Sequence, residues 1–365
     1  MNDLRIDKYA DVIVDYSTGV KKGDIVQIDA FGTAAAPLVK EVYRKCLEKG
    51  ALYVDYRIGL PDMARIFYDS ADSDQLGYFP RHKLDFMKEV DVYIGIAAAE
   101  NAMELAGVNQ ETMVAYNKLM RPITDERVKN SRWLVCRYPT QGMAQDARMS
   151  LDEFEDFLFS ACNIDWEKES VKQESLKRLL EGAERVRIRA SDTDVSFSIK
   201  GMAAMKCDGH RNLPDGEVYT APIRDSVEGF IAYNCPSLYQ GKEFNDVRLE
   251  FKKGKVVSAS STGMDLELNR ILDTDEGARY IGEFAIGVNR NITRPMRNIL
   301  FDEKIFGSIH LTPGQCYDAC DNGNKSAVHW DLVKILSGDG ELFFDDLLIQ
   351  KDGLFVHEDL LLLNS

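Results

Sequence analysis

The spacing of apolar residues in the first half of the chain alternates between helical and strand periods. Apolar residues lie three and four positions apart in Leu4–Tyr16 and Ala34–Glu48, which predicts two amphipathic helices. A third helix is predicted at Ser150–Cys162, with Ser150 as its N-cap. Because strands separated by helices are typical of a largely parallel sheet, residues 1–168 are predicted to form an α/β domain. Its strands are predicted at 25–28, 52–56, 90–96 and 132–137.

The pattern changes after Lys172, where β-type runs follow one another with few helices between them. Gly254-Lys255 and Gly338-Asp339-Gly340 are predicted to form hairpin turns. Residues 169–365 are therefore predicted to form an α+β domain with a mainly antiparallel sheet. A helix is predicted at 174–184 and strands at 186–190, 195–199, 247–251 and 255–259.

Length and composition are those of a globular protein with two domains. The chain has 365 residues, of which 45% are apolar and 29% are charged. It has no apolar run near the roughly 18–20 residues that cross a bilayer, and its start lacks the basic and apolar regions of a signal peptide. The seven cysteines are scattered, without a CxxC pair, which favours a reducing cytoplasm.

Net charge argues against a nucleic-acid partner. The formal charge is −15, whereas binding to a nucleic acid requires a clustered basic face. The acidity is consistent with simple solubility, and a site built from carboxylates would also contribute to it.

Several well-known motifs are missing from the sequence. No GxGxxG fingerprint, Walker loop, GxSxG elbow or HExxH signature is present. His357-Glu358 begins like the last of these, but Leu361 stands where the second histidine is needed, so His357 is predicted to be a surface residue. Cys207 and His210 have no second ligand pair and are predicted to be turn residues. The loop with Asp318, Asp321 and Asn322-Gly323-Asn324 lacks the spacing of a calcium site and is predicted to be solvated.

Four local features of the second domain carry candidate chemistry. Glu217 follows a Pro-Asp-Gly turn, which fixes the backbone at the head of a strand. Glu283 is a lone carboxylate in an apolar, glycine-flanked run, an expensive place for an unpaired charge. His310 lies in an apolar strand pattern. His329 and Asp331 are two positions apart, so that in a strand both side chains face the same side while Trp330 turns away.

Each feature alone also fits an ordinary core or loop residue, but together they supply three carboxylates and two imidazoles. Oxygen and nitrogen donors without thiolate favour Zn²⁺, Co²⁺ or Mn²⁺, and Mg²⁺ is a further candidate. One catalytic zinc needs only three protein ligands, whereas five ligands with a shared carboxylate suit two metals about 3.5–4 Å apart. The sequence therefore predicts two divalent metal ions per chain.

Segments along nearly the whole chain resemble the aminopeptidase T family of metallopeptidases, which includes the aminopeptidase S proteins. The resemblance is strongest at Ile281–Asn289 and continues through Leu213–Pro222, Phe251–Val257 and Tyr138-Pro139-Thr140. It implies an N-terminal α/β domain, a C-terminal metal-binding domain and a homodimer. It also implies an activity that removes N-terminal residues from peptides.

The resemblance also assigns roles to single residues. It implies that the metals are held by Glu217, Glu283, His310, His329 and Asp331, and that Tyr317 takes part in the site. This chain departs from the family in two places. Only 18 residues separate His310 from His329, which is shorter than in the family, and Leu311-Thr312-Pro313-Gly314 replaces a run of small residues.

Three functions are compatible with these residues. The first is a metalloaminopeptidase in which the metals activate water, Glu283 lies near both metals and Tyr317 donates a hydrogen bond to the oxyanion. The second is a mononuclear Fe(II) ring-cleaving dioxygenase of the 2,5-dihydroxypyridine type, with His310, His329 and Asp331 as its ligands. The third is a binding protein without catalysis. The filled set of five donors favours the peptidase.

Overall fold

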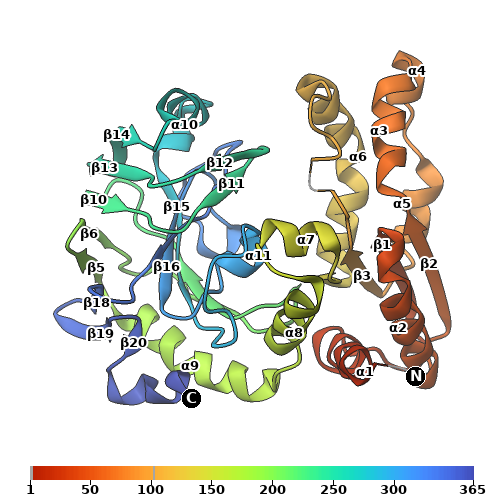
Figure 1. The fold of residues 1–365 in the computed structure, drawn as a ribbon, viewed down its shortest axis with the longest axis horizontal. Helices are drawn as coiled ribbons and strands as arrows, with labels where there is room; N and C mark the ends of the chain where they lie inside the picture. The colour runs from red at the N-terminus through yellow and green to blue at the C-terminus, as the bar shows by residue number, and fades with distance from the viewer. Residues whose placement is uncertain (1–2, 102) are drawn as a thin grey trace. The chain divides into compact units, whose positions relative to one another are not determined.

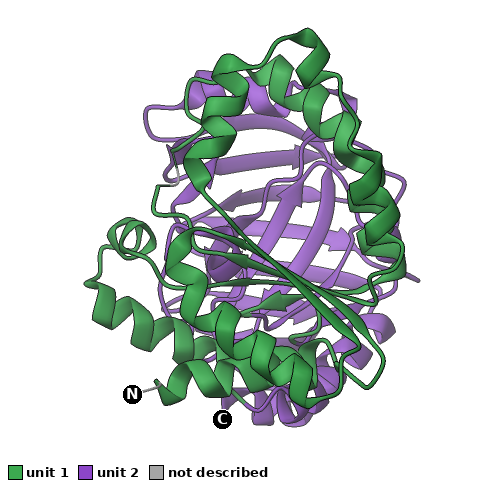
Figure 2. Cartoon of the chain, turned by 90° about the vertical axis from the view of Figure 1, so that its right-hand side faces the viewer, with its two compact units in different colours: residues 1–164, 209–214 green, residues 165–208, 215–365 purple. Residues whose placement is uncertain are grey.

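The computed structural model describes residues 3–101 and 103–365. Two compact units make up the chain, and Figure 2 draws them in separate colours. One unit comprises Met1–Ile164 and Gly209–Pro214, and the other comprises Asp165–Asp208 and Asp215–Ser365. The short segment at residues 209–214 therefore belongs to the first unit, although it lies far beyond the predicted boundary between residues 168 and 169.

The first unit is built on a parallel sheet of five strands in the order β2-β1-β3-β4-β8. Its third strand is buried from Val92 to Ile96, as expected for a parallel sheet covered on both faces. The prediction of an α/β fold with a parallel sheet is confirmed. The strands are β1 (Ile25–Phe31), β2 (Tyr53–Gly59), β3 (Val92–Ala97), β4 (Arg132–Arg137) and β8 (Asn212–Leu213).

Helices connect the strands of this unit (Figure 1). The predicted N-cap of α8 is present: the Ser150 hydroxyl accepts the Glu153 N–H, and the Glu153 carboxylate accepts the Ser150 N–H, which forms a capping box. The first predicted helix ends as a π-helix at Val12–Ser17. The helices are α1 (Leu4–Asp11), α2 (Ala36–Glu48), α3 (Pro61–Ser70), α4 (Ser73–Leu76), α5 (Arg81–Met87), α6 (Gln110–Asn130), α7 (Gln141–Asp146) and α8 (Leu151–Cys162).

The second unit contains two antiparallel sheets and a two-stranded ribbon. The larger sheet has the order β14-β13-β10-β6-β5-β18-β19-β20. Its strands are β5 (Arg185–Ala190), β6 (Thr193–Ser198), β10 (Glu228–Ala232), β13 (Arg248–Lys252), β14 (Lys255–Ser260), β18 (Glu341–Phe344), β19 (Leu347–Lys351) and β20 (Leu354–Phe355). The ribbon pairs β11 (Ser237–Tyr239) with β12 (Lys242–Phe244).

The smaller antiparallel sheet has five strands in the order β17-β16-β15-β9-β7. The predicted hairpin at Gly254-Lys255 joins β13 to β14. The predicted hairpin at Gly338–Gly340 is wrong, because this turn leads from one sheet to the other, and a local turn signal does not define the strand that follows. The strands are β7 (Met205–Cys207), β9 (Glu217–Thr220), β15 (Ile281–Gly287), β16 (Ser308–Pro313) and β17 (Leu332–Ile335).

The two sheets of this unit share one hydrophobic core. Phe197 of the larger sheet meets Phe284 of the smaller sheet edge to face, with ring centroids 5.1 Å apart. Every residue of β15 is buried, so this strand is covered on both faces. Since Phe284 points into the core, the neighbouring Glu283 points to the opposite face. The unit also contains α9 (Trp166–Gly182), α10 (Asp265–Leu272) and α11 (Ile299–Asp302).

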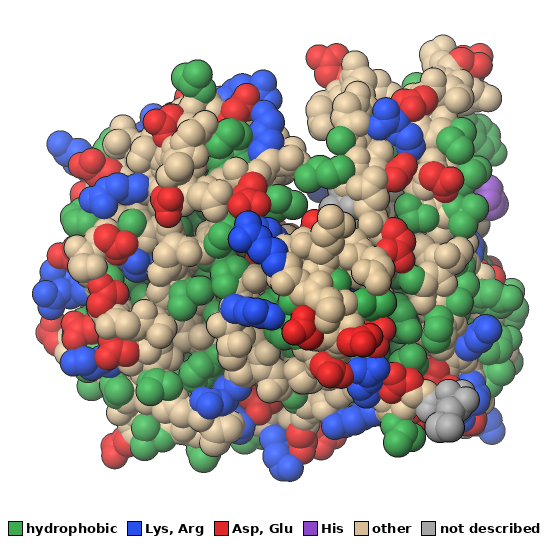
Figure 3. Space-filling model, in the orientation of Figure 1, with side chains coloured by type: hydrophobic (Ala, Val, Ile, Leu, Met, Phe, Trp, Pro, Cys, Tyr) green, Lys and Arg blue, Asp and Glu red, His purple; other side chains and the backbone are tan. Residues whose placement is uncertain are grey.

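Charged side chains of both signs are mixed on the face drawn in Figure 3, and they do not gather there into one basic patch. None of the described helices combines the length and the apolar composition that crossing a membrane requires.

Candidate metal site

Neighbouring strands of the smaller sheet bring the predicted donors together. Glu217 begins β9, Glu283 lies on β15 and His310 on β16, which are adjacent in the sheet. His329 forms an isolated bridge with Gly314, and Asp331 directly precedes β17, the next strand in the order. The five side chains therefore come from one sheet and from the segment that leads into its strand β17, although they span 114 positions of sequence from 217 to 331.

Glu283 occupies the centre of this group. Its Oε1 lies 3.6 Å from Nε2 of His310, and its Oε2 lies 3.4 Å from Nε2 of His329. The residue is only 3% exposed. A register shift in the pairing of β15 with β16 precedes it, at Gly282, where an added Cβ would lie 2.4 Å from two backbone oxygens. Glycine is therefore required beside Glu283, because no side chain fits at this bulge.

Glu217 approaches His310 from the other side. Its Oε2 lies 3.7 Å from Nε2 of His310, and its Oε1 accepts a 2.6 Å hydrogen bond from the ammonium of Lys304. Glu217 is 5% exposed, and Lys304 and His310 are 1% exposed. The two oxygens of one buried carboxylate thus face different partners.

His329 and Asp331 face the same side, while Trp330 turns away. Oδ1 of Asp331 lies 3.4 Å from Nε2 of His329. Trp330 is buried on the other side and donates its indole N–H to the Ser237 hydroxyl at 2.8 Å. The Nδ1–H of His329 donates to the Gln315 carbonyl at 2.8 Å, which directs Nε2 toward the carboxylates.

The close carboxylates change the pKa values of both imidazoles. Burial opposes the charged form of His329, but its contacts with Asp331 and Glu283 outweigh this effect and raise its pKa to about 11. Burial likewise opposes the charged form of His310, whose pKa is raised to about 9 by Glu283 and Glu217. Burial also disfavours the Glu283 and Asp331 carboxylates, yet the imidazoles hold the pKa of both below their usual values. A cation is therefore favoured among these carboxylates.

The donor set fits a divalent metal ion. Glu283, His310 and Asp331 each offer a ligand atom, and these atoms lie within 4.8 Å of one another. Glu217 Oε2 and His329 Nε2 are buried without a hydrogen-bond partner among the described residues. Buried polar atoms without partners are costly, and a metal held by carboxylate and imidazole donors would satisfy them.

Family membership agrees with this geometry. The family model described as thermophilic metalloprotease (M29) matches residues 2–339. The chain belongs to this metalloprotease family. The resemblance noted in the sequence is confirmed, and the alternative of an Fe(II) dioxygenase has no support.

Known relatives of this M29 chain cover nearly its whole length. Aminopeptidase 2 of Geobacillus stearothermophilus is 24% identical over 403 residues, which cover 96% of this chain and 95% of that protein. Aminopeptidase AmpS of Bacillus subtilis is 23% identical and covers 90% of this chain and 88% of its own. The structure of wild-type AmpT from Thermus thermophilus has the same fold, with a TM-score of 0.84 at 21% identity over 97% of this chain and 99% of that one.

Tyr317 lies at the edge of the candidate site. Its ring centroid is 4.9 Å from that of His329 and 5.5 Å from that of Tyr219, and the residue is 48% exposed. The ring is thus held by two neighbours while the residue stays accessible to a ligand.

The loop between Tyr317 and His329 is more ordered than the sequence predicts. Asn324 is 1% exposed and donates its amide to the carbonyls of Gly277 and Gly314 at 2.9 and 2.6 Å. Asn322 donates to the carbonyls of Pro222 and Ile281. The prediction of a solvated loop is therefore wrong for these two residues, because their amides donate to backbone carbonyls of other segments.

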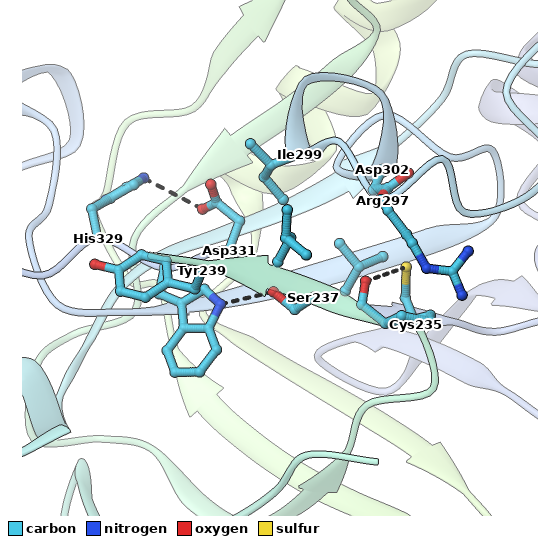
Figure 4. A pocket seen from close by; sticks show the side chains of 12 residues that line it. Cys235, Ser237, Tyr239, Arg297, Ile299, Asp302, His329 and Asp331 are labelled. Carbon is cyan, nitrogen blue, oxygen red and sulfur yellow. Dashed lines mark hydrogen bonds and ion pairs between the residues drawn. The ribbon is translucent and has the colours of Figure 1, made fainter. Parts of the chain in front are cut away.

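A pocket adjoins the candidate ligands, and Figure 4 shows its side chains. His329 and Asp331 form one side, and Ile299 points toward the interior between them and Ser237. The pocket encloses about 500 Å³ of empty space, part of it open to solvent. Its lining is Cys235, Pro236, Ser237, Leu238, Tyr239, Arg297, Ile299, Asp302, His329, Trp330, Asp331 and Val333.

The other residues singled out by sequence are His210, His357 and Cys207, and the two histidines have neighbours outside the candidate site. The His210 ring packs against Tyr16 with centroids 4.5 Å apart, and His357 caps the final 3₁₀ helix by accepting the Asp359 N–H. Cys207 ends β7 and groups with Asp215 and Glu217, where ligand atoms again lie within 4.8 Å. Its assignment as a plain turn residue therefore misses this grouping.

Two residues of the site were missed by sequence reasoning. Thr312 is buried and donates to Oδ1 of Asp331 at 2.6 Å. It lies two positions after His310 on the same strand face, a signal that the alternation could have supplied. Lys304 was also missed, because it directly follows Asp302 and Glu303 in the sequence, and a run of charged residues is ordinarily exposed to solvent.

Proposed function

We propose that this M29 metalloprotease is an aminopeptidase that hydrolyses the first peptide bond of substrates with a free N-terminus. The observation that carries the proposal is the buried Glu283 carboxylate, whose two oxygens face two imidazoles beside an open pocket. The relatives that cover most of the chain are named aminopeptidases, which supports the same activity.

The ligands of the metal site are proposed to be Glu283, His310, His329 and Asp331, with the uncommitted oxygen of Glu217 facing His310. A bound divalent metal would lower the pKa of a water molecule and polarise the substrate carbonyl. The protein orients the ligands through two hydrogen bonds: the Gln315 carbonyl accepts from the Nδ1–H of His329, and the Thr312 hydroxyl donates to Asp331.

Tyr317 is proposed to donate its hydroxyl to the oxyanion that develops on the substrate carbonyl. Its ring packs against His329 at the edge of the site, and its exposure leaves the side chain accessible to substrate. A donor prepositioned where negative charge develops stabilises the transition state. The carboxylates of the site give this region a negative potential, which favours the ammonium group of a free N-terminus.

The pocket beside His329 and Asp331 is proposed to receive the side chain of the N-terminal residue. Ile299, Val333 and Tyr239 give it an apolar lining, while the hydroxyl of Ser237 is already used by Trp330. An aliphatic side chain of the size of leucine is therefore the expected occupant, because burying it removes apolar area from water.

Zn²⁺, Co²⁺ and Mn²⁺ are the proposed metals, since nitrogen and carboxylate donors suit them. The homodimer remains a prediction, and so does a cytoplasmic location, with which the seven free cysteines agree. The predicted count of two metal ions assumes that all five donors are available, and Glu217 already shares one oxygen with Lys304.

A comparison of free and blocked substrates tests the activity. Leucine p-nitroanilide should be hydrolysed after Zn²⁺, Co²⁺ or Mn²⁺ is added to chelator-treated protein, and the N-acetylated substrate should not. Glu283→Gln should lower kcat/KM at least about 100-fold, because it removes the central charge. Glu341→Gln, on the other sheet, is the matched control and should keep full activity.

Two outcomes would contradict the aminopeptidase. Equal hydrolysis of the blocked substrate would show that a free N-terminus is not recognised. No turnover of any aminoacyl nitroanilide or peptide with any of the three metals would instead support a binding protein on the same scaffold.

A further inference from the structure

A buried ammonium lies inside the carboxylate cluster of the candidate site. Lys304 is 1% exposed, and its Nζ lies 2.6 Å from Oε1 of Glu217, 2.6 Å from Oε1 of Glu303 and 3.7 Å from Oδ1 of Asp215. A buried lysine must be compensated by paired charges, and here three carboxylates surround it. The ammonium is therefore an integral part of the site.

Glu217 connects this ammonium to the candidate metal ligands. One of its oxygens accepts from Lys304, and the other lies 3.7 Å from Nε2 of His310. In sites with two metals, one carboxylate commonly bridges two cations that are about 3.5–4 Å apart. The carboxylate of Glu217 likewise lies between two groups, with the ammonium of Lys304 at one oxygen and His310 at the other.

The donors of the second unit fall into two groups that differ in their relation to Lys304. In the part of the chain that the structure describes, Glu283, His310 and Asp331 form no ion pair with the ammonium. Asp215 and Glu217, which form the other group with Cys207, both lie within 4 Å of it. A divalent ion in the latter group would need oxygens that Lys304 already engages. It would also stand next to a fixed positive charge, and the two would repel each other.

We propose that the ammonium of Lys304 occupies the place of a second metal ion, so that this chain holds one catalytic metal, bound by Glu283, His310, His329 and Asp331. Lys304 acts as a positioning residue that fixes one oxygen of Glu217 and leaves the other facing His310. This inference rests on the proposed metal site, and it replaces the two ions predicted from sequence with one ion and one ammonium.

Metal content is the direct test. Chelator-treated protein equilibrated with excess Mn²⁺ and passed through a desalting column should retain about one Mn²⁺ per chain. Its electron paramagnetic resonance spectrum should be that of an isolated ion, without exchange coupling. Two Mn²⁺ per chain with a coupled spectrum would overturn the proposal.

The variant Lys304→Met removes the charge and keeps the length of the side chain. It should bind a second Mn²⁺, so that the count rises to about two per chain and exchange coupling appears. A count that stays at one would overturn the proposal, because some other feature would then limit the site.

Lys334→Met is the matched control. Lys334 is equally buried at 2% exposure and lies in the same unit, but its ammonium pairs with Asp192 and the Ala232 carbonyl. This variant also loses a buried ammonium that pairs with a carboxylate, yet its Mn²⁺ count should stay at one. If both variants gained a second ion, the effect would come from loosened packing, and the proposal would fail.

The variant is informative even if it does not fold without metal. Because a divalent ion would replace the ammonium among the same oxygens, Mn²⁺ should restore a cooperative thermal transition to Lys304→Met. A variant that stays unfolded in Mn²⁺ would overturn the proposal. The proposed function is judged separately, since hydrolysis of leucine p-nitroanilide with one bound ion supports both, and hydrolysis with two supports the aminopeptidase alone.

Discussion

Thr312 donates its hydroxyl to Oδ1 of Asp331 across 2.6 Å, and this bond joins β16 to the segment that begins β17. Thr312 is completely buried, while the side chain of Asp331 is 12% exposed. It fixes one oxygen of a carboxylate whose environment also contains His329. Hydrogen bonds of this kind around metal ligands set their orientation and basicity.

Replacement of Thr312 by valine should therefore weaken metal binding about 10-fold or more while the fold persists. The isosteric change removes one hydrogen bond to a charged group, which costs about 1.5–3 kcal/mol of stability in the metal-free protein. Titration calorimetry with Mn²⁺ measures the affinity. Thr220→Val is the control, because Thr220 is equally buried in the same sheet but donates to the Ala203 carbonyl, so it should lose stability and keep its affinity.

Metal binding should release protons and should become tighter as the pH rises. The pKa values of His310 and His329 are raised to about 9 and about 11, with burial opposing the charge and the neighbouring carboxylates favouring it. Near pH 7 the metal-free protein therefore holds both imidazoles protonated, whereas ligation requires them neutral. Calorimetry in two buffers of different ionisation enthalpy should show up to about two protons released per ion.

The same pKa values determine how the stability of the metal-free protein changes with pH. Protonated His310 and His329 stabilise it fully below their unfolded pKa of 6.5, and this contribution is lost as the pH rises through about 9 and about 11. An affinity that is constant from pH 6 to pH 8 with no proton release would show that the imidazoles are neutral before the metal binds.

Asp302 should make the free energy of unfolding fall between pH 4 and pH 7. Burial raises its pKa from 3.8 to about 7, against the hydrogen bonds that it accepts from the Met296 and Asn298 N–H groups. The folded protein thus retains a proton that the unfolded chain releases, so the contribution of Asp302 to stability is largest at low pH and declines by up to about 4 kcal/mol as the pH rises. Denaturant unfolding at several pH values measures this slope.

The variant Asp302→Asn should remove that slope. Its absolute stability will also reflect the loss of one acceptor oxygen, so the dependence on pH, rather than the midpoint at one pH, decides the question. Asp346→Asn, at an exposed position, should keep the slope of the natural chain. A slope that persists in Asp302→Asn would assign it to another group.

Ile299→Trp should change substrate preference without preventing catalysis. Ile299 points into the pocket beside Asp331 and is 41% exposed, so a larger ring fills space without disturbing the core. The kcat/KM ratio of leucine to alanine nitroanilide should fall about 10-fold, which is typical for a side chain that loses its pocket. Ile223→Trp is the control at 39% exposure outside the pocket, and an equal change in both variants would exclude this pocket as the determinant.

Local patterns in the sequence were sufficient to identify the candidate metal ligands. Glu283 stands out because a charge in an apolar run must have partners, and the structure gives it two imidazoles. The spacing of His329 and Asp331 indicates a common face, and both side chains meet although the strand begins only at Leu332. These features depend on residues that are close in sequence, so they can be recognised without knowledge of the fold.

Contacts between segments that are far apart in sequence could not be predicted in the same way. The ion pair of Lys304 with Glu217 joins residues 87 positions apart, and no periodicity in the sequence predicts it. The turn at Gly338–Gly340 has the composition of a hairpin, but the sheet that receives the next strand is decided by tertiary packing. The burial of Asn324 likewise depends on carbonyls of Gly277 and Gly314, which only the folded sheet brings near.

The position of β8 in the sequence determines how long its partner strand β4 stays unpaired during synthesis. It pairs with β4 through Asn212 and Leu213, some 75 residues after β4 ends at Arg137. During synthesis the outer edge of β4 is therefore exposed while the next segments leave the ribosome, at about 5–20 residues per second. For several seconds a nascent chain therefore carries an unpaired strand edge. Such an edge can bind a chaperone, or it can pair with a second nascent chain that is being translated from the same messenger RNA.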